Sequence, residues 1–292
     1  MAGARVIMAV VTDGAGTEWA DPALVPWWSF AKTALAAAAL ALVGDGRLGL
    51  DTPVRAWPFT LRQLLQHRAE LPDYGHLAAY HESVAAGEQP WARDMLLRRV
   101  GADKLIFEPG LGWSYSNVGY LLVRELVEGA TGQDLGTALN GLVFHPLGIT
   151  GVRVAYAPAD LNTTAWGNPS GYHPGWVYHG LLVGSAADAA KVLHRLLGGG
   201  LLPRALLRDM LAAHPVGDPV PGRPWRTGNY GLGLMVGVGD TGATYVGHTG
   251  SGPGSTAAVY CCTQGSRRTV AAFARVDDPA TVERHAMKLI QR

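Results

Sequence analysis

The chain has 292 residues, of which 48% are hydrophobic and 16% charged, which is typical of a globular protein with an ample core. Its 24 Lys and Arg balance 23 Asp and Glu to a formal net charge of +1, and they are scattered, so no nucleic-acid-binding surface is predicted. The only cysteines, Cys261 and Cys262, are adjacent. Neighbouring side chains of a strand point to opposite faces, so two separate thiols are predicted and no disulfide.

The first elements along the chain are two predicted strands. Val6 to Thr12 is a buried strand, and "GTEWADP" (16–22) is its partner after a glycine-rich turn. The apolar start is broken by Asp13 and Gly14 and lacks a cleavage site, so we interpret it as a strand and not a signal peptide or membrane span. A cytoplasmic protein without membrane association is therefore expected, with a chain trimmed of its leader as the alternative.

An Ala-rich helix begins near Ser29 and ends at the "GDG" breaker of residues 44–46. Helical spacing then predominates as far as residue 197. Four further segments follow that spacing: 60–71, 91–101, 116–132 and 185–200. Ser185 is the predicted N-cap of the last.

The C-terminal part changes to short β-prone runs. Gly, Asp and Gln-Gly turns separate four of them, 229–240, 241–250, 255–265 and 267–278, and predict an antiparallel meander. A last helix begins at Pro279. Strands at both chain ends with helices between them predict an α+β fold, in which one antiparallel sheet built from both ends is flanked by helices. We expect residues 1–54 and 181–292 to form this sheet subdomain and residues 55–180 to form a mainly helical one.

Ser29 and Lys32 form a Ser-x-x-Lys pair at the start of the Ala-rich helix. Positions i and i+3 share a helix face, and free backbone N–H groups at a helix start can stabilise an oxyanion. A desolvated lysine can be neutral enough to accept the serine proton. On its own the pair is more typical of an N-cap serine with a lysine that reaches solvent.

A second candidate is the loop "YSN", residues 115–117, just before a predicted helix. Tyr115 close to a lysine ammonium could have a lowered pKa and pass protons, and the Asn117 carboxamide could orient a substrate amide or ester. The alternative is packing for Tyr115 and helix capping for Ser116 and Asn117.

A third candidate is "VGHTGSGPG" (246–254), at the end of a predicted strand. Gly250 would let a ligand approach, and the N–H of Ser251 could point at a carbonyl oxygen. The alternative is an ordinary turn with His248 at the surface. Each alternative is strong for one motif, but not for all three together.

In this order the three motifs resemble the serine β-lactamase and penicillin-binding superfamily, which carries the Ser-x-x-Lys signature. The chain is most similar to the branch that holds class C β-lactamases, D,D-peptidases, D-aminopeptidases and β-lactamase-like esterases. The resemblance covers most of the chain, from about Val6 to the end, and includes "LVGDGRLGLDTPV", "LRQLLQHRAELPDYG", "FEPGLGWSYSNVGYLLV", "YGLGLMV" and "GHTGSGPG".

The resemblance implies that Ser29 is the acylated nucleophile, that Lys32 accepts or relays its proton, and that Tyr115 works with this lysine. It also implies an active site between the two subdomains. Five further positions would bind substrate or form the oxyanion hole: Asn117, His248, Thr249, Gly250 and Ser251. In the oxyanion hole, the N–H groups of Ser29 and Ser251 would act together.

The chain departs from the family pattern at three places. Ala31 stands where Thr or Ser is usual before the lysine, and Arg-Ala-Glu (68–70) replaces Thr-Ser-Gly, so that loop is expected to differ in shape. His248 takes the place held by Lys in many lactamases. The loss of this permanent charge, which would bind a substrate carboxylate, favours esters or amides over penicillins.

Other residue types suggest little further chemistry. No His-Glu-x-x-His is present, so neither a metal nor another cofactor is expected, and His67 and His145 are interpreted as structural. Six tryptophans in predicted loops are core residues by default, yet together they could form an aromatic acyl or aryl pocket: Trp27, Trp28, Trp113, Trp166, Trp176 and Trp225.

The sequence therefore predicts a serine hydrolase that forms an acyl-enzyme on Ser29 and cleaves a carboxylic ester or a small amide. Hydrolysis of β-lactams or D-amino-acid peptides is an alternative, as is acyl transfer at the same site. A catalytically inactive ligand-binding homologue is a third alternative. The expected partner is a small molecule, and the sequence does not indicate an oligomeric state.

Overall fold

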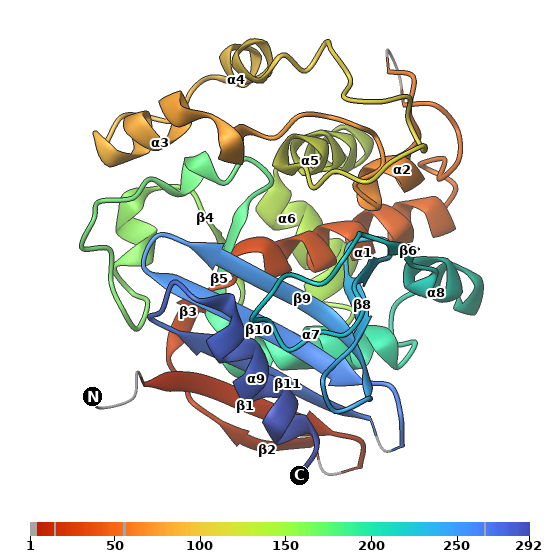
Figure 1. Cartoon of the computed structure of the whole chain (residues 1–292), viewed down its shortest axis with the longest axis vertical. Coiled ribbons are helices and arrows are strands. Elements are labelled where there is room, and N and C mark those ends of the chain that lie inside the picture. Colours follow the sequence, from red (N-terminus) through yellow and green to blue (C-terminus); the bar gives the residue numbers. More distant parts are fainter. Residues whose placement is uncertain (1–4, 15, 55–56, 266) are drawn as a thin grey trace.

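A large antiparallel sheet forms the lower part of the molecule as drawn in Figure 1. The computed structural model describes residues 5–14, 16–54, 57–265 and 267–292. In spatial order the strands of this sheet are β2 (Gly16–Ala20), β1 (Val6–Thr12), β11 (Arg268–Ala274), β10 (Ser255–Cys262), β9 (Thr244–Gly252), β8 (Met235–Val238), β7 (Asn229–Tyr230) and β6 (His214–Pro215). The sheet built from both chain ends and the α+β fold are thus confirmed.

Alternating side chains give this sheet two buried faces. One face packs on α7 (Ala186–Leu197), and the other packs on the C-terminal helix α9 (Pro279–Ile290) (Figure 1). Cys261 belongs to the core cluster on the α7 face, whereas Cys262 belongs to the cluster on the α9 face. Both thiols are free and buried, so the prediction of two separate cysteines is confirmed.

The strand bounds differ from prediction where the strands are short. The run 229–240 is not one strand but two, β7 and β8, joined by a tight turn at residues 231–234. A second, three-stranded sheet of order β3 (Leu24–Pro26), β5 (Leu181–Ser185) and β4 (Arg153–Ala155) was not predicted. Strands of three to five residues carry too few positions to show a period of two.

The Ala-rich helix α1 (Ala31–Gly44) runs through the middle of the molecule (Figure 1). Eleven of its residues are buried, including five of its alanines in the run 34–39, because it contacts α5, α6 and α7. A helix that is apolar all round is typically buried. Small side chains let a neighbour come close: a Cβ at Gly233, in the turn after β7, would lie 2.2 Å from the Ala36 methyl.

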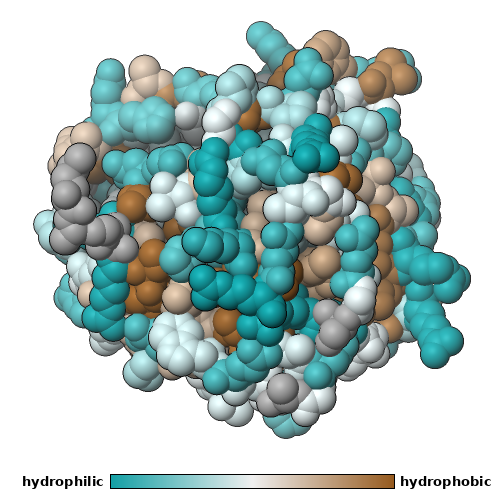
Figure 2. Space-filling view, turned by 60° about the horizontal axis from the view of Figure 1, so that its bottom comes forward, coloured by the Kyte–Doolittle hydropathy of each residue, from teal (hydrophilic) through white to brown (hydrophobic). Residues whose placement is uncertain are grey.

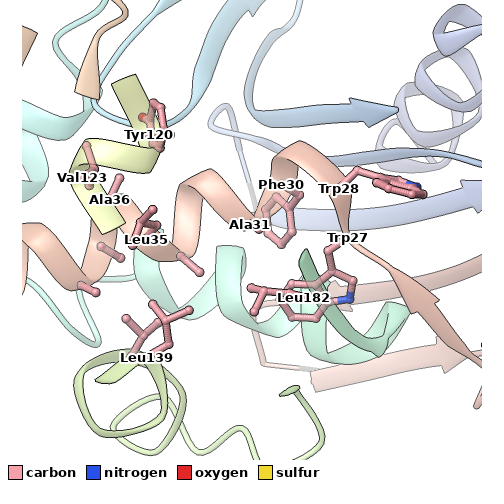
Figure 3. Close-up of a cluster of buried hydrophobic side chains, with 14 of the residues drawn as sticks. Trp27, Trp28, Phe30, Ala31, Leu35, Ala36, Tyr120, Val123, Leu139 and Leu182 are labelled. Carbon is pink, nitrogen blue, oxygen red and sulfur yellow. The ribbon is translucent and has the colours of Figure 1, made fainter. Parts of the chain in front are cut away.

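The sequence predicts Ser29 in the first turn of the Ala-rich helix, and this prediction is wrong. Ser29 lies in a preceding 3-10 turn, η1 (Trp28–Phe30), whose last residue is followed directly by the helix. Figure 3 shows that Trp27 points toward Leu182 of β5, whereas Trp28 points to the opposite side of the turn, toward the large sheet. The two tryptophans therefore fix η1 between the two sheets.

The remaining helices agree with prediction where the segment is long. Helix α5 (Asn117–Thr131) has Ser116 as its N-cap, α7 has Ser185, and α9 has Asp278 with Pro279 in its first turn. The predicted helix 60–71 is wrong beyond its first turns. The other short elements are α2 (Leu61–Leu65), η2 (Tyr74–His76), α3 (Ala78–Ala85), α4 (Arg93–Val100), α6 (Leu135–Leu139), a π-helical turn η3 (Asn140–Phe144), η4 (Pro158–Leu161), η5 (Pro174–Trp176) and α8 (Arg204–Leu211).

Many polar side chains lie on the face of the molecule that Figure 2 draws. Figure 2 shows hydrophilic residues spread over the face near both chain ends, with separate hydrophobic areas between them. Within the described ranges, no helix is both long and apolar enough to cross a membrane.

Candidate active site

The turn η1 holds Ser29 against the edge of the large sheet. Strand β9 passes so close that a Cβ on Gly250 would lie 2.6 Å from the Ser29 backbone nitrogen. Trp28 has a positive φ of 46°, and its Nε1 donates a buried hydrogen bond to Ser255 Oγ at 2.9 Å. This hydrogen bond therefore fixes Trp28, the residue immediately before Ser29.

Lys32 follows one helical turn later and is fully buried. Its Nζ lies 3.2 Å from Ser29 Oγ and donates to Asn117 Oδ1 at 2.7 Å. Burial lowers the pKa of Lys32 from 10.5 to about 7, an effect that the negative charge of Asp73 opposes. A lysine with this pKa can accept a proton from a neighbouring hydroxyl near neutral pH.

Tyr115 lies on the other side of the serine. Its hydroxyl donates to Ser29 Oγ at 3.0 Å, and its ring centroid is 5.0 Å from Lys32 Nζ. The expectation of a lowered pKa is wrong: burial raises the pKa of Tyr115, and the hydrogen bond with Ser29 offsets this only in part. Tyr115 is therefore a protonated phenol that can donate.

The segment around Asp73 holds Asn117 in place. The Asp73 carboxylate accepts from the Asn117 backbone N–H at 2.8 Å and from its Nδ2 at 3.1 Å. Burial raises the pKa of Asp73, while the hydrogen bonds from Asn117 and the charge of Lys32 oppose that rise. Sequence reasoning missed Asp73, although "LPDYG" lies within a segment that resembles the family.

His179, just before β5, is a second residue that the sequence analysis missed. Its two ring nitrogens lie 3.3 and 3.5 Å from Lys32 Nζ, and only 4% of the residue is exposed. Burial lowers the pKa of His179 well below its ordinary value, so the imidazole is neutral and can accept a hydrogen bond from the lysine. No local motif marks it, because its partner is 147 positions away.

His248 is buried. The alternative interpretation, an ordinary turn with His248 at the surface, is therefore wrong. His248 Nε2 lies 2.8 Å from the Tyr230 hydroxyl and its Nδ1 lies 2.6 Å from the Thr249 carbonyl oxygen. Burial lowers the pKa of His248 to about 3, so it is neutral and supplies no cation. The Thr249 hydroxyl bonds to Tyr260 and Glu283 on the α9 face of the sheet, which leaves only its backbone near the site.

The loop of residues 67–70 packs against Tyr115 and bonds to the backbone on either side of it. His67 has a φ of 57°, its ring lies 4.3 Å from that of Tyr115, and its Nδ1 accepts from the Ser116 N–H at 3.1 Å. Glu70 also has a φ of 57° and accepts from the Gly112 N–H at 3.1 Å. The interpretation of His67 as structural agrees with these contacts, although its buried Nε2 has no hydrogen-bond partner among the residues that the structure describes. His145 is exposed.

A pocket of about 460 Å³, open to solvent, lies over Ser29. Its walls hold no Lys, Arg, Asp or Glu among the described residues. It is lined by Trp28, Ser29, Tyr74, Gly75, Tyr80, Asn117, Tyr172, Trp176, Val177, His179, Ser251, Gly252 and Pro253. Two of the six tryptophans singled out in the sequence thus lie at this pocket, while Trp113 and Trp225 line a different cleft and Trp27 lies in the core.

An α+β fold of this topology, with a Ser-x-x-Lys pair whose lysine is fully buried and whose serine faces a pocket just before the central helix, defines the class of the protein: it is a serine hydrolase. More narrowly, the chain belongs to the Beta-lactamase family, whose sequence profile matches residues 5–291.

Curated relatives of different activities match parts of the chain. Penicillin-binding protein 4* of Bacillus subtilis (strain 168) is 33% identical over 134 residues, 43% of this chain and 29% of the relative. Esterase EstB of Burkholderia gladioli is 32% identical over 155 residues, 46% of this chain and 39% of the relative. Each match thus spans less than half of the relative's length.

Solved structures share the fold over nearly the whole chain. The D-amino acid amidase of Ochrobactrum anthropi SV3 superposes with a TM-score of 0.79 and 22% identity, over 98% of this chain and 94% of that one. A D-stereospecific amidohydrolase of Streptomyces superposes with a TM-score of 0.77 and 23% identity, over 93% and 89%. At this identity the likeness shows the fold alone.

Proposed function

We propose that the chain hydrolyses carboxylic esters or small amides through an acyl-enzyme on Ser29. The observation that carries the proposal is the contact of 3.2 Å between Ser29 Oγ and the fully buried Lys32 Nζ, with the Tyr115 hydroxyl 3.0 Å from the same oxygen. A non-catalytic binding protein has no need for a hydroxyl held between a lysine of lowered pKa and a phenol donor.

The residues suggest one sequence of proton transfers. Neutral Lys32 accepts the Ser29 proton as Oγ adds to the substrate carbonyl, and the N–H groups of Ser29 and Ser251 face the oxyanion that forms. Tyr115 donates its proton to the leaving alcohol or amine as the bond to carbon breaks, and Lys32 reprotonates Tyr115. A water molecule then adds to the acyl carbonyl, and the carboxylic acid is released as its bond to Ser29 Oγ breaks. One proton of this water ends on Ser29 Oγ.

The pocket favours an uncharged group next to the scissile bond. Trp28, Tyr80, Tyr172 and Trp176 supply aromatic walls, and His248 is neutral where a lysine would bind a carboxylate. Esters with aromatic or apolar acyl groups are therefore the first choice. Amides are the second choice, which the likeness to a D-stereospecific amidohydrolase and a D-amino acid amidase supports.

Mass spectrometry of the intact protein tests the acyl-enzyme. A fluorophosphonate should add one adduct to the wild-type chain, none to Ser29→Ala, and one to Ser185→Ala, which changes a serine that does not line the pocket. Turnover of p-nitrophenyl esters should disappear in Ser29→Ala and exceed penicillin turnover in the wild type. A well-folded protein that gives no adduct with fluorophosphonate or penicillin would overturn the proposal.

A further inference from the structure

A second compartment adjoins the nucleophile pocket. It encloses about 650 Å³ including its open mouth and shares three lining residues with that pocket: Trp28, Tyr172 and Pro253. The Trp28 and Tyr172 rings meet edge to face with centroids 5.9 Å apart, and these two rings lie between the two spaces. The segment that precedes β5 (green in Figure 1) and the turn between β9 and β10 supply opposite walls.

Internal hydrogen bonds hold the walls of this compartment. Asn168 Nδ2 donates to the carbonyl oxygens of Pro158 and Tyr172 at 3.2 and 3.0 Å, and its Oδ1 accepts from the Tyr172 N–H at 2.9 Å. On the opposite side, Ser255 fixes the Trp28 indole through the bond at 2.9 Å. The compartment is therefore formed before any substrate enters.

Arg275 is the single charged side chain among the lining residues that the structure describes. It follows the last residue of β11, and no described carboxylate lies within ion-pairing distance of it. Ser170 and Ser255 add hydroxyl groups to the same walls, whereas hydrogen bonds to the backbone occupy the Thr164 hydroxyl and the Asn168 amide. A guanidinium near hydroxyl groups is a site for a planar anion such as a carboxylate.

We propose that the second compartment binds a carboxylate of an elongated substrate, with Arg275 as its ion-pair partner, while the scissile carbonyl lies at Ser29. The inference rests on the proposed function and narrows its substrate class. The nucleophile pocket, whose walls carry no charge, binds the uncharged part of the substrate. The substrate carboxylate lies on the other side of Trp28 and Tyr172, in the second compartment. In this proposal, a substrate carboxylate is recognised at Arg275 in the second compartment and not at His248 on β9.

Two series of p-nitrophenyl and alkyl esters test the site. One series carries a terminal carboxylate, methyl ester or ammonium on the acyl chain, and the other carries the same groups on the alcohol. In one of the two series, wild-type kcat/KM should favour the carboxylate over the methyl ester by about tenfold, the order expected for one charge-assisted contact. Arg275→Gln should remove this preference, and Arg275→Glu should transfer it to the ammonium ester.

Arg204→Gln, on α8 and outside both pockets, is the matched control and should keep the wild-type preference. If all variants cleave neutral esters equally but neither series depends on Arg275, the carboxylate site is wrong and the proposed function stands. If the wild type cleaves no ester, the test is a binding measurement: calorimetry of Ser29→Ala with a dicarboxylic monoamide that is not cleaved. Loss of this binding on Arg275→Gln would support the carboxylate site. Equal binding with and without Arg275→Gln, or no binding at all, would overturn it.

Discussion

The environment of Lys32 decides how the site responds to pH. Burial brings its pKa from 10.5 to about 7, and Ser29, Asn117, Asp73 and His179 surround its ammonium group. The group must lose its proton before it can accept one from serine, so acylation should rise with pH through a midpoint near 7. Pre-steady-state bursts with a neutral p-nitrophenyl ester between pH 5 and 9 measure this midpoint.

The same measurement assigns a role to His179. Its neutral imidazole can accept from the Lys32 ammonium, which stabilises the charged form and raises the lysine pKa. His179→Leu should therefore move the midpoint of acylation to lower pH, whereas His179→Gln, which keeps an acceptor, should stay near the wild type. An unchanged midpoint in His179→Leu would mean that the imidazole only fills space.

Sequence reasoning found the residues of this site that lie in local motifs. Lys32 lies within hydrogen-bond distance of Ser29 and Asn117, and Tyr115 lies within that distance of Ser29, so the structure brings the motifs together. His179 was missed because its only signal is a contact with a residue far away in the chain. The pKa of Tyr115 was predicted in the wrong direction, because burial cannot be judged from a loop sequence.

At the scale of elements, the site depends on a close approach of β9 to η1. A Cβ on Gly250 would lie 2.6 Å from the Ser29 nitrogen and 2.9 Å from the Trp28 Cβ, so backbone would have to shift. Gly250→Ala should slow acylation by on the order of tenfold or more, because a displacement of about 1 Å at a reacting group has effects of that size. Stopped-flow acylation by a neutral ester measures the change.

Gly129→Ala is the matched control, since a Cβ at that position of α5 would meet nothing within 4 Å. Its acylation rate should equal that of the wild type. A Gly250→Ala variant with the wild-type rate would show that η1 tolerates movement of β9.

The success of element prediction followed element length. Strands β9, β10 and β11, of seven to nine residues, and helices α5, α7 and α9, of twelve to fifteen, all lie where their periodicity placed them. The helix predicted over 60–71 instead ends after Leu65, and His67 then takes a left-handed conformation. That conformation presents the His67 ring to Tyr115, a tertiary contact that no local pattern contains.

At the scale of the whole molecule, one buried ion pair joins segments far apart in the chain. Arg223, in the segment before β7, pairs with Glu283 of α9, whose side chain is fully buried and also accepts from Thr249 of β9. Arg223→Met would leave this carboxylate buried without its cation. The free energy of unfolding in urea should fall by about 3–5 kcal/mol, as for other broken buried pairs.

The double variant Arg223→Met/Glu283→Gln removes both charges and provides the comparison. It should recover a large part of the lost stability, because a neutral amide costs less to bury than a carboxylate. If the double variant is as unstable as Arg223→Met, packing of the arginine side chain and not its charge holds these segments together.

The two adjacent cysteines give access to the two halves of this core separately. Cys261 contributes to the cluster under α7 and Cys262 to the cluster under α9, and burial raises the pKa of the Cys261 thiol to about 11. A thiol reagent can therefore label either sulfur only when the helix above it opens. Single-cysteine versions of the chain thus carry natural reporters, one residue apart, for the local opening of each face of the sheet.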